Sequence, residues 1–302
     1  MTAMVEVEHF RMDFGSTTVV RDLSFTVARG ETFGFLGSNG SGKTTTIRAL
    51  LGIYPPTGGA LLVDGKRFGP DSGIRLGYLP EERGLYKKES VIDVMTYFGR
   101  LKGMTSRDAR TWSTGYLERV GLAEKAKTRL DKLSGGQQQK VQLGVTVMNA
   151  PELLILDEPT KGFDPVNRRL LMDVIDDQRR AGATVVMVTH QMEEVERLCE
   201  RIVLLKDGSA RAYGTVREVQ DAFGGPTARV RHSAPLPRSD RWRVQTDDDG
   251  LAVLEPAPDA APEQVLDALV SGGAGVTGFE MTPTPLDEVF LQVYGADAAS
   301  EL

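Results

Sequence analysis

The chain has 302 residues, of which 40% are hydrophobic and 26% are charged, and its formal net charge is −6. This length suits one large and one small domain, and the composition is ordinary for a folded globular protein. The negative charge argues against a general nucleic-acid binder, because neutralising phosphates requires clustered lysine and arginine. No uncharged apolar run reaches the roughly 18 residues of a membrane helix, so any role at a membrane is expected to depend on a partner.

Two further features predict a place in the cytosol. The first residues lack the basic-then-apolar pattern of a signal peptide. The single cysteine, Cys199, cannot form an internal disulfide, which fits a reducing compartment.

Short β-branched runs alternate with helical patterns through residues 1–224, which predicts an α/β domain around a mainly parallel sheet. Residues 91–130 are poor in strand signals, which predicts a helical subdomain inserted at about 83–150. The expected strands include residues 5–7, 61–63, 153–156, 185–188 and 202–205, and residues 191–200 form an expected helix.

A glycine-rich loop follows a strand expected at residues 32–36 and leads into a helix expected from residue 45. Its sequence, Gly-Ser-Asn-Gly-Ser-Gly-Lys-Thr, fits the phosphate-binding pattern G-x-x-x-x-G-K-[ST], and the flanking strand and helix disfavour a plain surface turn. The glycines let backbone N–H groups surround an anion at the helix N-terminus. Lys43 is expected to hold the phosphates of ATP and Thr44 to bind Mg²⁺. The predicted nucleotide-binding residues here are Gly37, Ser38, Asn39, Gly40, Ser41, Gly42, Lys43, Thr44 and Thr45.

The apolar run at residues 153–156 ends on two carboxylates, Asp157 and Glu158. A strand there would bring Asp157 to the metal side of the phosphate loop, where a carboxylate binds Mg²⁺ directly or through water. Glu158 could then orient and deprotonate the attacking water. An acidic pair at a strand end is common by itself, so the prediction depends on its combination with the phosphate loop.

The sequence changes character at a Gly-Gly-Pro break, residues 224–226. Beyond it, residues 225–302 carry 5 Lys+Arg and 13 Asp+Glu, whereas residues 1–224 are nearly neutral. Strands expected at 242–244, 251–254 and 275–281, with a helix at 262–270, predict a small α+β appendage. The predicted domains are therefore 1–224 and 225–302.

Residues 133–137 read Leu-Ser-Gly-Gly-Gln, which resembles the signature motif of ABC ATPases, and the resemblance extends over about residues 4–220. It implies that Ser134, Gly135, Gly136 and Gln137 bind the γ-phosphate of ATP held on an opposing subunit. A helix N-terminus with two glycines and a serine is also a physical anion site. Without the other motifs, the same residues would be an ordinary serine cap with flexible glycines.

The resemblance implies three further roles. Phe14 occupies the position of an aromatic residue that stacks on adenine, although a phenylalanine in a strand is more often part of the core. His190, after a predicted strand, matches the histidine that contacts the γ-phosphate. In the loop after Glu158, Lys161 and Phe163 replace the usual serine and leucine, so only Asp164 carries over.

One position departs from the family pattern: Glu81 stands where a glutamine is usual, in a loop that links Mg²⁺ and the attacking water to a membrane partner. A carboxylate still binds Mg²⁺. The run Tyr-Leu-Pro-Glu-Glu-Arg-Gly-Leu-Tyr and the C-terminal residues 284–291 are similar to those of ABC-2-type and drug-exporter ATPases. The C-terminal run is better explained as a packing helix that carries no chemistry.

These features predict a phosphate-loop ABC ATPase core with a helical subdomain and a small α+β C-terminal appendage. The resemblance implies an ATP-hydrolysing subunit of an exporter that closes as a head-to-tail dimer around two MgATP, with catalytic Lys43, Glu158 and His190 and metal-binding Thr44, Glu81 and Asp157. The subunit would lie on the cytoplasmic face of the membrane, bound to an integral membrane permease. It would pair with a second ATPase subunit, identical or different, and would not bind nucleic acid.

Two other classes compete with this interpretation. A soluble ABC ATPase acting on ribosomes or DNA would usually have two cassettes or long coiled-coil insertions, and this chain has one set of motifs. A GTPase or kinase would leave the Leu-Ser-Gly-Gly-Gln motif unexplained, and no Asn-Lys-x-Asp guanine motif is present.

Overall fold

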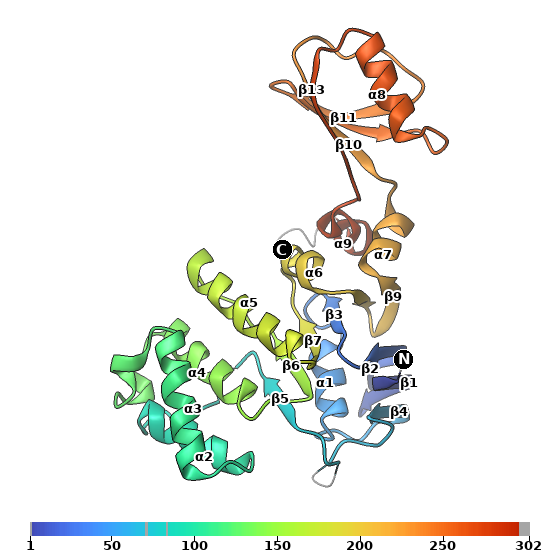
Figure 1. The fold of residues 1–302 in the computed structure, drawn as a ribbon. Helices are drawn as coiled ribbons and strands as arrows, with labels where there is room; N and C mark the ends of the chain where they lie inside the picture. Colours follow the sequence, from blue (N-terminus) through green and yellow to red (C-terminus); the bar gives the residue numbers. More distant parts are fainter. Residues whose placement is uncertain (1, 70–71, 83, 296–302) are drawn as a thin grey trace. The chain divides into compact units, whose positions relative to one another are not determined.

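The computed structural model describes residues 2–69, 72–82 and 84–295 (Figure 1). It divides into two compact units, one ending at Tyr213 and the other starting at Gly214. The boundary predicted after residue 224 would follow helix α7 (Val216–Phe223), whereas the structural division precedes that helix. The reason is that α7 packs against α9 (Leu286–Tyr294), which belongs to the second unit.

The first unit contains a nine-stranded sheet, and its mixed α/β class confirms the predicted fold class. Three strands at one edge pair antiparallel, and the five strands at the opposite edge pair parallel. In sheet order the strands are β4 (Gly58–Val63), β1 (Ala3–Phe14), β2 (Thr17–Ala28), β9 (Ser209–Thr215), β8 (Arg201–Lys206), β3 (Thr32–Gly37), β7 (Thr184–Val188), β6 (Leu153–Asp157) and β5 (Leu76–Leu79).

The strands that position the site are apolar because they are buried on both faces. Every residue of β3, β6 and β7 is buried, which explains why these runs lack the alternation of a half-exposed strand. β7 lies between β3 and β6 and is parallel to both. The carboxyl ends of the three strands therefore meet at one edge of the sheet, where ligands bind in open α/β sheets.

Helices flank this sheet and begin at recognisable caps. α1 (Lys43–Leu50) starts directly after the phosphate loop, and α5 (Pro165–Arg180) starts after the cap Asp164 with proline in its first turn. α6 (Met192–Leu198) follows β7 and falls within the predicted helix at 191–200.

The predicted helical section is confirmed by three α-helices and two short 3₁₀ turns. Ser90 and Thr105 cap the first two helices by accepting hydrogen bonds from backbone N–H groups. The elements are α2 (Val91–Leu101), α3 (Ser106–Arg119), η1 (Ala123–Lys125), η2 (Leu130–Lys132) and α4 (Gly135–Val147).

The contact of α3 with α4 gives a prediction about stability. A Cβ on Gly144 would overlap the ring of Tyr116 and come within 2.9 Å of the Met95 methyl group. We therefore expect Gly144→Ala to lower the free energy of unfolding by about 1–3 kcal/mol, measured by denaturant titration. The control is Gly115→Ala, on an exposed face of α3 with nothing near the added Cβ, which should raise stability by about 0.5–1 kcal/mol. Equal stability of the two variants would contradict the tight packing.

The second unit is a four-stranded antiparallel sheet with helices, as predicted for an α+β appendage. Its core joins the sheet to helix α8 through Val230, Leu254, Val265 and Leu269, which are fully buried. In sheet order the strands are β11 (Trp242–Asp248), β12 (Leu251–Pro256), β10 (Thr227–His232) and β13 (Val276–Thr282), and α8 spans Pro262–Ser271. Among the described residues of the whole chain, no helix has the length and apolar character needed to cross a bilayer.

Candidate nucleotide-binding site

The phosphate loop lies between β3 and α1 and is shaped by close backbone packing. A Cβ on Gly37 would lie 2.5 Å from Ser41 Oγ and 2.6 Å from the carbonyl oxygen of Leu205, so the end of β8 fills the space where a side chain would stand. Gly40 and Gly42 have φ of 78° and 109°, in the left-handed region that favours glycine. The loop therefore keeps the close backbone turn that its sequence predicts.

Two polar groups of this loop suit a bound phosphate. Lys43 Nζ donates hydrogen bonds to the carbonyl oxygens of Gly37 and Ser38 at 2.7 and 2.9 Å, which keeps the ammonium over the loop. Ser41 Oγ is buried and has no hydrogen-bond partner within the described part of the chain. A buried hydroxyl without a partner is costly, and a phosphate oxygen would satisfy it. The residues present thus fit the phosphates of a nucleotide.

Asp157 and Glu158 stand at the end of β6, beside the end of β7. Asp157 is 4% exposed, and its burial, together with the negative charges of Glu158 and Glu81, raises the pKa of its carboxyl group to about 6. A cation placed there would relieve this repulsion. The donor set of Thr44 and Asp157, with carboxylates close by, therefore fits Mg²⁺, which prefers oxygen ligands.

Glu158 is held by both the backbone and the side chains of β7 and the residues after it. Its N–H donates to the carbonyl oxygen of Val188 at 2.8 Å, and its φ of 50° is in the left-handed region, uncommon for a non-glycine residue. His190 Nδ1 lies 2.8 Å from Glu158 Oε1, and the Thr189 hydroxyl donates to Glu158 Oε2 at 3.4 Å. The structure therefore brings together Glu158 and His190, two residues predicted separately from sequence.

Glu81 has a partner that the sequence did not predict. Lys161 Nζ donates a hydrogen bond to Glu81 Oε1 at 2.7 Å, and this contact raises the pKa of the Lys161 ammonium. The two residues are 80 positions apart, so no local pattern could have indicated the pairing.

Asp164 lies where a local structural role explains its side chain. It caps α5 by accepting hydrogen bonds from the N–H groups of Val166 and Asn167, and these contacts lower the pKa of its carboxyl group. Its predicted contact with a nucleotide stays a prediction.

The signature residues form the start of α4. Ser134 Oγ accepts from the N–H of Gln137 at 3.3 Å, and Gln137 Oε1 accepts from the N–H of Ser134 at 3.0 Å, which is a reciprocal capping box. The side chain of Gln137 is therefore engaged within its own helix. Gly135 and Gly136 occupy the first helical turn, the position of an anion site.

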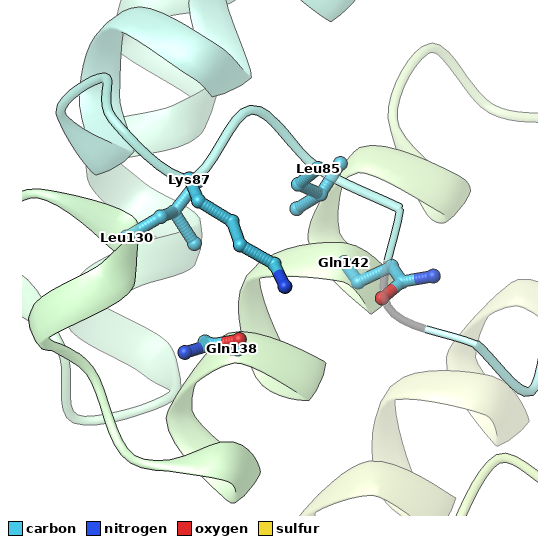
Figure 2. Close-up of a pocket in the computed structure, with 5 residues that line it drawn as sticks. All are labelled: Leu85, Lys87, Leu130, Gln138 and Gln142. Carbon is cyan, nitrogen blue, oxygen red and sulfur yellow. The ribbon is translucent and has the colours of Figure 1, made fainter.

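Helix α4 also contacts the loops that carry Glu81 and Glu158. Gln139 Nε2 donates to the carbonyl oxygen of Pro159 at 2.8 Å, and Gln142 Nε2 donates to that of Glu82 at 3.1 Å. Figure 2 shows Lys87 extending toward Gln138 of this helix, and both residues line a small pocket. The links made by these two glutamines were not predicted, although the spacing of the glutamines along one helix face was a possible signal.

Phe14 ends β1 and is exposed, so the alternative that it belongs to the core is wrong. The residue is 45% exposed, and its ring packs edge to face with the Tyr54 ring at 5.4 Å between centroids. An exposed aromatic face is available for stacking, and the predicted adenine contact stays a prediction.

Comparisons with known proteins agree with these observations. The family model described as ABC transporter matches residues 20–161, and the model described as ATP-binding protein DrrA1-3-like, C-terminal domain, matches residues 214–294. An uncharacterized ABC transporter ATP-binding protein of Bacillus subtilis is 34% identical over 301 residues, which cover 97% of this chain and 99% of the relative.

Two further similarities involve an exporter and a solved structure. The Nod factor export ATP-binding protein I of Cupriavidus pinatubonensis is 34% identical over 309 residues, covering 98% of this chain and 92% of that protein. A solved structure described as the ATP binding subunit of an ABC transporter is 28% identical, with a TM-score of 0.69, and the match covers 74% of this chain and 94% of that one. Subunits of this kind dimerise and work with membrane components. The chain therefore belongs to the family of ABC transporter ATP-binding proteins, which bind ATP with Mg²⁺ and hydrolyse it.

Proposed function

We propose that this chain is the ATPase subunit of an exporter, that it closes as a head-to-tail dimer around two MgATP, and that it acts on the cytoplasmic face of the membrane through a separate permease. The observation that carries the proposal is the contact of Glu158 with His190. This contact lies at the edge of the sheet where the strand before the phosphate loop also ends. Similarity to a Nod factor export protein over nearly the whole of both chains supports export over import.

In the proposed reaction, Lys43 binds the β- and γ-phosphates and Glu158 accepts a proton from the attacking water. His190 orients the Glu158 carboxylate, which its 2.8 Å contact supports. Thr44 and Asp157 would hold Mg²⁺, which would neutralise part of the phosphate charge. The adenine would stack on Phe14.

The second half of each site comes from the partner subunit in this proposal. Ser134, Gly135 and Gly136 would bind the γ-phosphate held by the opposing phosphate loop, through the helix N-terminus. Gln137 and Asp164 would contribute by holding the starts of α4 and α5, a role that their capping contacts support. ATP would thus act as a ligand that shifts the population toward a closed dimer, and the second subunit could be identical or different.

The permease contact is proposed for an aromatic groove lined by Tyr86, Glu89, Asp93, Val94 and Tyr97. The rings of Tyr86 and Tyr97 meet edge to face at 5.7 Å, and both side chains are exposed, at 56% and 44%. Its two carboxylates suit the lysine and arginine residues that are enriched in the cytoplasmic loops of membrane proteins. Leu85, the residue before Tyr86, lines the small pocket of Figure 2 instead of this groove.

The aromatic groove gives a testable prediction. We expect the double change Tyr86→Ala and Tyr97→Ala to abolish co-purification of a polytopic membrane protein from native membranes, because it removes the exposed anchors of the groove. ATP hydrolysis by the isolated subunit should stay within about twofold of wild type, because the groove lies outside the residues assigned to chemistry.

Val270→Ala is the control for this experiment, since it removes an exposed apolar side chain from α8. Recovery of the same membrane protein with the double variant would contradict the groove assignment. Recovery of ribosomes or DNA, with no membrane protein even for wild type, would favour a soluble ABC ATPase.

A further inference from the structure

The loops after β5 and β6 are joined by an ion pair whose function the proposed reaction does not explain. Lys161 Nζ donates to Glu81 Oε1 at 2.7 Å, and both side chains are about half exposed. Exposed pairs of this kind contribute little to folding stability, because water screens the charges and two long side chains must be ordered. Stability therefore does not account for a lysine at this position.

The electrostatic surroundings point to a different role. β5 and β6 are parallel neighbours with Leu79 opposite Leu156, so Glu81 follows one strand end while Asp157 and Glu158 stand at the other. Carboxylates at the ends of adjacent strands favour cations in their surroundings. Lys161 contacts Glu81 directly in this structure. It therefore offsets part of the negative charge where Mg²⁺ is expected.

The backbone around the pair is anchored, so the side chains are the parts free to exchange partners. The carbonyl oxygens of Glu82 and Pro159 both accept hydrogen bonds from glutamines of α4, at 3.1 and 2.8 Å. These anchors lie one residue from Glu81 and two from Lys161. The half-exposed carboxylate and ammonium can swing apart while the two loops keep their spacing.

We propose that Lys161 is a positioning residue that competes with Mg²⁺ for the Glu81 carboxylate. The ion pair holds Glu81 in the nucleotide-free subunit, and the carboxylate leaves Lys161 when the metal enters with ATP. This inference depends on the proposed nucleotide site and names the regulation of its metal affinity.

The competition predicts the direction of a binding change. Lys161→Ser should strengthen Mn²⁺ binding, used as the spectroscopic substitute for Mg²⁺, in the presence of a non-hydrolysable ATP analogue. The affinity for Mn²⁺ is expected to rise roughly three- to tenfold, which corresponds to the interaction energy of one pair of unit charges screened by water at contact distance. Free Mn²⁺ is counted by electron paramagnetic resonance in a metal titration, so the readout does not depend on turnover. The melting temperature should be unchanged, because the pair adds little to stability.

Three further variants separate pairing from general charge effects. Lys161→Arg keeps the ion pair and should bind Mn²⁺ like wild type. Lys125→Ser removes an exposed lysine in η1 and should have no effect. In a Glu81→Gln background, Lys161→Ser should lose most of its effect, because the carboxylate it competes for is gone.

The outcomes distinguish this inference from the proposed function. If wild type binds no Mn²⁺ with the analogue, the proposed MgATP site fails. Two results would overturn the competition between Lys161 and metal while the ATPase assignment stands. In the first, wild type binds Mn²⁺ but Lys161→Ser leaves the affinity unchanged. In the second, Lys161→Ser raises the affinity by the same factor in the wild-type and in the Glu81→Gln background.

Discussion

Glu158→Gln is expected to abolish ATP turnover and to leave the protein as an ATP-bound dimer. The amide keeps the shape of the carboxylate but cannot accept the proton of the attacking water. General base catalysis contributes about 10²- to 10⁴-fold to rate, so turnover should fall by at least that factor. The backbone N–H of residue 158 still bonds to the carbonyl oxygen of Val188, which keeps the side chain in place. Phosphate release measures turnover, and size-exclusion chromatography with MgATP measures the dimer.

The matched control is Glu193→Gln, which removes one exposed carboxylate from α6 without touching the contact between Glu158 and His190. It should hydrolyse ATP at close to the wild-type rate and remain monomeric once the ATP is consumed. Normal turnover by Glu158→Gln would refute Glu158 as the base.

Lys43→Ala is expected to weaken ATP binding by roughly 10- to 150-fold. A hydrogen bond to a charged group is worth about 1.5–3 kcal/mol, and the alanine removes the ammonium that faces the phosphates. In the structure the same ammonium bonds to the carbonyl oxygens of Gly37 and Ser38, so its removal also loosens the loop before nucleotide arrives. Titration with a fluorescent ATP analogue measures the dissociation constant.

Lys125→Ala provides the comparison for this experiment, because it deletes an exposed lysine outside the phosphate loop. Its affinity for ATP should match wild type. Equal affinities for Lys43→Ala and wild type would mean that the loop binds phosphates through its backbone alone.

The elements that the sequence predicted well have signals within a few residues of one another. β6 and β7 each contain four consecutive apolar residues, so burial on both faces could be inferred directly. The phosphate loop combines glycines at fixed positions with a strand before and a helix after. The start of α4 follows from a serine cap with glutamine three residues later.

The missed features depend on tertiary contact. β10 contains three buried residues, Thr227, Ala228 and Val230, among exposed arginines. It was not predicted because its pairing with β12 and β13 is what defines it as a strand. The Glu81–Lys161 pair joins two loops that only the sheet order brings together. The exposure of Phe14 could not be inferred either, because a strand end is buried or open according to what packs beside it.

The two glutamines of α4 have a consequence for the spacing of the catalytic loops. Gln139 and Gln142 are three residues apart, so they project from one face of the helix with a rise of about 4.5 Å between them. The spacing of these two glutamines along the helix thus sets the distance between the loop that contains Glu81 and the loop that contains Glu158. Inserting one residue between the glutamines would rotate one of them by about 100° around the helix axis, and the loop that it holds would lose its hydrogen bond. Substitutions that preserve helical pitch here are tolerable, and changes in length are not.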